Sequence, residues 1–140
     1  MKRLFYLFPL LCFSLYQYAQ TVTDYRCQFF NEKMQRMNFS DSVLNLGGLL
    51  NAKEISAFLG NKKDPKQKVT IQQMTVTINR VRQKMTEFEI TGNRIMEGNE
   101  FYDEFKLCVQ GDKIYIDHIV YKTASGEVKS FNKGFVFVLK

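Results

Sequence analysis

The chain has 140 residues, of which 45% are hydrophobic, and it carries a formal net charge of +6 at pH 7. This length allows one hydrophobic core and is too short for two domains of usual size. Lys and Arg are spread along the sequence, whereas nucleic-acid binders cluster them on one face, so no nucleic-acid partner is expected.

The first nineteen residues have the layout of a secretory signal peptide. Lys2 and Arg3 precede an uncharged apolar run over 4–16, and a short polar segment follows. A membrane helix needs about 20 apolar residues, so a retained anchor is the weaker interpretation. We expect cleavage near Ala19 and Gln20. The remaining domain, 20–140, is then exported without a transmembrane segment, to the periplasm, the outer envelope or the medium.

Two cysteines, Cys27 and Cys108, remain after that cleavage. In an oxidising compartment an even number of cysteines suggests a disulfide. A bond across so long a loop is worth roughly 4 kcal/mol at most. Two buried free thiols are the alternative, and the sequence does not choose between them.

The first part of this domain contains one predicted strand, over 25–30. The following segment, 31–41, fits either a helical turn or a loop. The apolar piece 43–50 is interrupted by two glycines, which indicates a bend, a bulge or a close backbone approach. It is not a phosphate-binding loop, because no Gly-Lys-Ser/Thr follows it. Residues 51–59 fit one helical turn or an extended segment, and 60–68 form the clearest loop.

A second, long strand is predicted over 69–82. Its first apolar residues, Val69 and Ile71, are out of phase with the later set that begins at Met74, so a bulge or twist is required. A third strand over 85–91 follows after a short break, which is typical of an antiparallel hairpin.

The segment 96–109 has the only helical pattern that we identify. Phe101 and Phe105 form its apolar face, and acidic residues precede Lys106, as a helix dipole prefers. The acidic residues are Glu97, Glu100, Asp103 and Glu104. An exposed helix face explains them better than acid-base catalysis does.

The longest uninterrupted strand pattern, over 111–122, organises the end of the chain. Period-two alternation places Ile114, Ile116, His118 and Val120 on the core face and leaves a mixed face opposite. A turn at 123–127 and a last apolar strand over 134–140 follow. The sequence therefore predicts a mostly β domain with one short helix.

No catalytic constellation accompanies these elements. His118 is the only histidine and is expected to be buried or half-buried, and no Gly-x-Ser-x-Gly elbow is present. One histidine and two cysteines are also few for a zinc site. We therefore expect no enzyme activity, cofactor or metal. Three tyrosines offer a binding surface, although half-buried tyrosines are commoner in sheets. They are Tyr102, Tyr115 and Tyr121.

Several short motifs occur in a characteristic order over 46–140. They are Leu46-Gly47-Gly48, Lys53-Glu54-Ile55-Ser56, the strand with Val69, Met74 and Val76, Thr91-Gly92-Asn93, Gly111-Asp112-Lys113-Ile114-Tyr115-Ile116-Asp117-His118-Ile119 and Ser125-Gly126-Glu127-Val128. This region resembles the C-terminal domain of the GldM family, the periplasmic component of gliding motility and type IX secretion in Bacteroidetes.

The resemblance implies an immunoglobulin-like antiparallel β-sandwich that binds other envelope proteins. The family's members are longer and begin with a membrane helix that couples to a motor. This sequence begins instead with an expected cleavable signal and has one domain, so the resemblance does not imply motor coupling here. A secreted adhesin or structural β-domain without a secretion-machine partner is the alternative. The sequence identifies neither the partner nor the oligomeric state.

Overall fold

The computed structural model describes residues 24–60 and 67–140. The expected signal peptide, its cleavage point at Ala19 and Gln20, and most of the predicted loop at 60–68 lie outside these residues. The elements within them are β1 (Asp24–Phe30), β2 (Val43–Leu44), α1 (Leu46–Asn51), β3 (Glu54–Gly60), β4 (Gln67–Asn79), β5 (Thr86–Thr91), α2 (Glu100–Lys106), β6 (Lys113–Lys122), β7 (Val128–Ser130) and β8 (Phe135–Leu139). The prediction of a mostly β chain is confirmed. None of the described helices is long and apolar enough to span a membrane.

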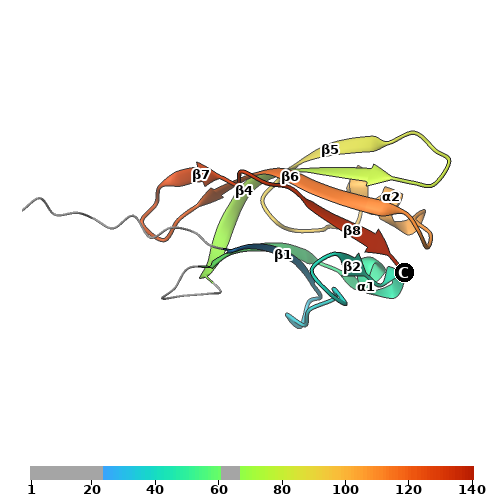
Figure 1. Cartoon of the computed structure of the whole chain (residues 1–140), viewed down its shortest axis with the longest axis horizontal. Coiled ribbons are helices and arrows are strands. Elements are labelled where there is room, and N and C mark those ends of the chain that lie inside the picture. The colour runs from blue at the N-terminus through green and yellow to red at the C-terminus, as the bar shows by residue number, and fades with distance from the viewer. Residues whose placement is uncertain (1–23, 61–66) are drawn as a thin grey trace, which may run out of the picture.

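The strands form one curled sheet in the order β1-β3-β4-β6-β8-β2, with β5 beside β4 and β7 beside β6. The short pair of β2 with β8 is parallel, and the other strand pairs are antiparallel. The sheet folds over so that β1 lies below β6 and β8 (Figure 1). Phe29 of β1 meets Phe137 of β8 edge to face at 5.1 Å between ring centroids. The core therefore lies between two layers of one sheet.

Asn38 connects the two ends of this strand path. It forms an isolated bridge with Leu44 of β2. On the other side, its buried side-chain Oδ1 accepts a hydrogen bond from the Phe29 N–H at 2.7 Å. Its Nδ2 donates to the Cys27 carbonyl at 3.4 Å. The Asn38 side-chain amide thus makes the two hydrogen bonds that a neighbouring strand would make to the outer edge of β1.

The phase shift predicted in the long strand is present in β4. Its pairing with β6 is irregular between Ile71 and Gln73 and again between Gln73 and Thr75. The irregularities let both apolar sets of β4 face the core, because Ile71 and Met74 are both buried.

The predicted faces of β6 are wrong beyond Ile116. His118 has a φ of 47°, and its side chain is 83% exposed. After it, Ile119 and Tyr121 point into the core in place of Val120. The cause is an extra residue in β6, since the segment from Asp117 to Val120 lies opposite a shorter segment of β4. Such a bulge moves every later side chain to the opposite face.

The predicted helix is present as α2, but the described part of the chain contains a second helix, α1, that was not predicted. The interrupted apolar piece contains α1, which the sequence patterns did not predict. Asn45 caps this helix, and its side-chain oxygen accepts from the N–H groups of Gly47 and Gly48. A Cβ at Gly48 would lie 2.9 Å from the Met37 carbonyl oxygen, so the expected close backbone approach is present.

Candidate functional site

The structure places His118 away from any pocket lining described below. Its Nδ1 lies 2.7 Å from Oδ1 of Asp117, the preceding residue in the bulge of β6. The expectation of a buried or half-buried histidine is therefore wrong, because His118 is exposed and its ring nitrogen lies beside a neighbouring carboxylate.

The three tyrosines pack against the protein, as the commoner of the two interpretations expected, and do not form an exposed binding surface. Tyr102 and Tyr121 are buried, and Tyr115 is half-buried. The Tyr121 ring meets Phe131 edge to face at 5.1 Å, and burial raises the pKa of its phenol. These tyrosines stabilise the core and the face of the sheet.

Cys27 and Cys108 are both buried, and both are free thiols. The structure thus contains the free-thiol alternative, not the disulfide. Burial raises the pKa of the Cys27 thiol far above its usual range. Burial, and after it the charge of Asp112, raises the pKa of the Cys108 thiol to about 12. The Cys108 Sγ also donates to the Glu104 carbonyl at 3.4 Å.

Both thiols are expected to react slowly with alkylating reagents in the folded protein. At pH 8 a pKa of about 12 leaves about one thiol in ten thousand as the reactive thiolate. Mass spectrometry of alkylated peptides should show little labelling of Cys27 and Cys108 under native conditions and complete labelling in denaturant without reductant. Labelling in denaturant only after reduction would instead demonstrate a disulfide.

Three adjoining hollows lie in a row on the described surface. The first, of about 440 Å³, shares Asn31, Glu32 and Lys53 with the second, of about 540 Å³. The second shares Arg94 and Met96 with the third, of about 650 Å³. We call these three hollows together the furrow. It is lined by residues from 31–37, 51–54, 87–91 and 94–101.

Backbone hydrogen bonds fix the centre of the furrow. The Ile95 N–H donates to the Lys53 carbonyl at 2.9 Å, and the Ile55 N–H donates to the Asn93 carbonyl at 2.8 Å. The segment after β5 therefore lies beside the start of β3. Ile95 is buried as its anchor, whereas Arg94 and Met96 are exposed.

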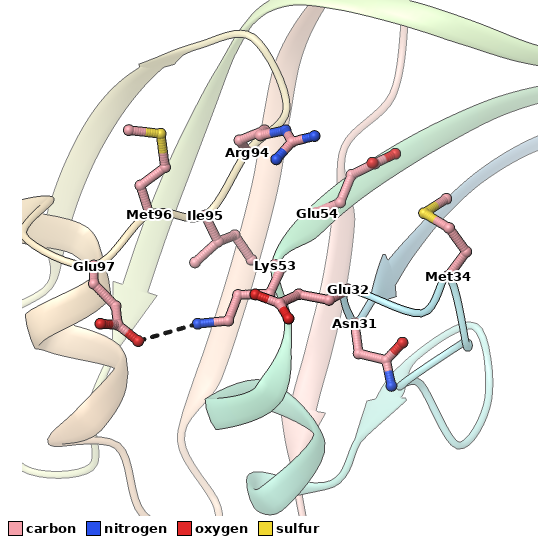
Figure 2. A pocket seen from close by; sticks show the side chains of 9 residues that line it. All are labelled: Asn31, Glu32, Met34, Lys53, Glu54, Arg94, Ile95, Met96 and Glu97. Carbon is pink, nitrogen blue, oxygen red and sulfur yellow. Dashed lines mark hydrogen bonds and ion pairs between the residues drawn. The ribbon is translucent and has the colours of Figure 1, made fainter.

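Charged groups cross and border the middle hollow. Figure 2 shows the Lys53 side chain extending across it to Glu97, where Nζ lies 3.2 Å from Oε1. Burial acts to raise the pKa of Glu54 on the rim. Hydrogen bonds from Lys68 and Ser56 and the charges of Lys68 and Arg94 outweigh this effect and lower the pKa. Glu54 is therefore a carboxylate at neutral pH.

Two exposed methionines stand at opposite sides of this hollow (Figure 2). Met34 is 51% exposed and Met96 is 54% exposed. A turn holds Met34 outward: its N–H donates to the Asn31 carbonyl, and Asn31 Oδ1 accepts from the Lys33 and Gln35 N–H groups at 2.9 Å each. Methionine is flexible and polarizable, which suits surfaces that adapt to a polypeptide partner.

The furrow was not identified from the sequence. Its lining comes from four separate segments, and none has a spacing that marks a site. Two irregularly placed methionines outside any apolar periodicity, Met34 and Met96, were the only signal available. No family model matches the chain, and neither does any curated protein.

Proposed function

We propose that the protein is a non-enzymatic, exported protein-binding module of the cell envelope. The motifs over 46–140 suggest similarity to the last domain of GldM, and hence an association with gliding motility or type IX secretion. The partner is an envelope protein, and binding needs no cofactor.

The furrow is the observation that carries this proposal. It joins three adjoining hollows, it presents Met34 and Met96 to solvent, and charged residues line it beside them. Interfaces between proteins combine exposed apolar anchors with a polar rim, and methionine is enriched in them. A small-molecule site is more often a single concave, mostly apolar pocket that encloses its ligand.

Crosslinking in intact cells tests the proposal. An affinity-tagged copy is crosslinked and purified, and attached proteins are identified by mass spectrometry. We expect type IX secretion or gliding components above an untagged control. Met96→Glu should lose them, because a charge replaces an apolar contact in the furrow. Met85→Glu is the matched control, since Met85 is 58% exposed and lies outside the furrow.

Two other outcomes would oppose the proposal. Recovery of the tagged protein alone, or of nothing, would favour a free adhesin or structural β-domain. Equal recovery with Met96→Glu and Met85→Glu would mean that the furrow does not form the contact.

A further inference from the structure

Strand β5 has an unpaired edge within the described part of the chain. It pairs with β4 and with no other described strand, and it lies at a margin of the sheet (Figure 1). The Gly92 N–H donates to the Gln72 carbonyl at 2.7 Å, just beyond the last register pair. Because bonded pairs alternate in an antiparallel ladder, Glu87, Glu89 and Thr91 direct their N–H and C=O groups away from β4. These groups can pair with an added strand.

The third hollow of the furrow lies along this edge. It is lined by β5 residues on one side and by the segment 94–101 on the other. Phe88 and Phe101 contact each other there, with ring centroids 6.3 Å apart, and Met96 is exposed. An added strand lies about 4.8 Å from its neighbour, and the hollow along this edge has a volume of about 650 Å³.

The charge beside the edge is opposite in sign to that of the whole chain. Glu87, Glu89 and Glu100 line the hollow, with Arg94 as its one basic lining residue among the described ones. No ion pair within the described residues involves any of the three carboxylates. Since the chain carries a net charge of +6, this acidic strip is a local feature and not a result of composition.

We propose that β5 binds an extended basic segment of a partner protein by strand addition. The segment has Lys or Arg at alternate positions, opposite Glu87 and Glu89, and apolar residues between them. Directly opposed residues of two strands share one face, so the basic side chains meet the carboxylates. The intervening side chains then face Phe88 and Phe101. This inference rests on the proposed protein-binding function and adds the chemistry of the partner.

A second copy of the chain fits this edge poorly. Pairing β5 with β5 would bring Glu87 and Glu89 of both copies onto one face of a shared sheet. Like charges at opposed positions destabilise a strand pair. The charged edge therefore disfavours self-association while it attracts a basic strand.

Peptide binding to the whole protein tests the proposal. The probe is a fluorescein-labelled Lys-Val-Lys-Val-Lys-Val peptide, and fluorescence anisotropy gives its affinity. A peptide with the same residues in the order Lys-Lys-Lys-Val-Val-Val is the control for charge alone. We expect the alternating peptide to bind about tenfold more tightly, because only it places all basic groups on the carboxylate face.

Two variants separate the charge from the backbone contribution. Glu87→Gln with Glu89→Gln should weaken binding of the alternating peptide about fivefold and reduce its salt dependence. Thr91→Pro removes one outward N–H without removing a bond to β4, and edge strands tolerate such a proline. It should weaken binding while far-UV circular dichroism stays unchanged. Hydrogen exchange at Glu87 and Glu89 should slow when the peptide is bound.

The results distinguish this inference from the proposed function. Equal affinity for both peptides, or binding that Thr91→Pro leaves unchanged, would overturn strand addition. If a variant that combines Glu87→Gln, Glu89→Gln and Thr91→Pro still recovered the cellular partners, protein binding would stand and the role of β5 would be refuted. A dimer in sedimentation that Thr91→Pro abolishes would make a second copy the occupant and overturn the basic peptide.

Discussion

Replacing Phe137 with alanine is expected to lower the free energy of unfolding by about 4 kcal/mol, because a buried phenylalanine leaves a cavity that the core fills only in part. Phe137 is 0% exposed, and its ring meets Phe29 across the two layers of the curled sheet. The substitution therefore removes contacts from both layers at once. Urea unfolding followed by circular dichroism measures the loss.

Val136→Ala is the matched control for this change. Val136 is the neighbouring residue in β8 and is 40% exposed. Its truncation should lower the free energy of unfolding by less than about 1 kcal/mol, because strand propensities of different residues differ by no more than that. Equal losses for the two variants would mean that Phe137 does not occupy the core between the layers.

Removing the buried carboxylate of Asp112 should destabilise the protein by about 3 kcal/mol, because two backbone donors lose a charged acceptor. Asp112 is 0% exposed. Its Oδ1 accepts from the Val81 N–H at 2.7 Å, and its Oδ2 accepts from the Val109 N–H at 2.8 Å. One side chain thus joins the turn after β4 to the loop after α2.

Asp112→Asn and Asp112→Ala together test this account. Asparagine keeps one acceptor oxygen and replaces the other with a donor, so it should cost less than alanine does. Asp103→Ala is the surface control, because Asp103 is exposed and pairs with Lys106 on the outside of α2. In denaturant unfolding, Asp112→Ala should lower the free energy of unfolding most, Asp112→Asn less, and the control Asp103→Ala least. An unchanged stability in Asp112→Ala would refute the role of the two bonds.

Elements with a strong local period were predictable from the sequence. The alternation around Val76 and Ile78 in β4 and the spacing of Phe101 and Phe105 in α2 each reflect one face packed on the core. Local side-chain spacing determines such elements, and the structure confirms them. Helix α1 was missed because its stability comes from the Asn45 cap and from packing, while its glycines suggested a bend.

The face of His118 was not predictable, because it depends on two strands together. The extra residue in β6 lies opposite an irregular part of β4, and pairing across the sheet accommodates both. A pattern within one strand contains no information about the partner's irregularity. The furrow was unpredictable for a similar reason: Asn31, Lys53 and Glu97 become neighbours only through the order of strands.

The parallel pair of β2 with β8 has a consequence for how the chain acquires its structure. Val43 and Leu44 pair with Val138 and Leu139, and the Leu46 N–H donates to the Lys140 carbonyl at 3.0 Å. Strand β2 and the start of α1 thus form these hydrogen bonds only after β8 has taken its place in the sheet. Contacts so distant in sequence carry a high closure entropy, and sheets built on them fold in milliseconds to seconds. The domain is expected to assemble in one late, cooperative step and not progressively from its N-terminal side.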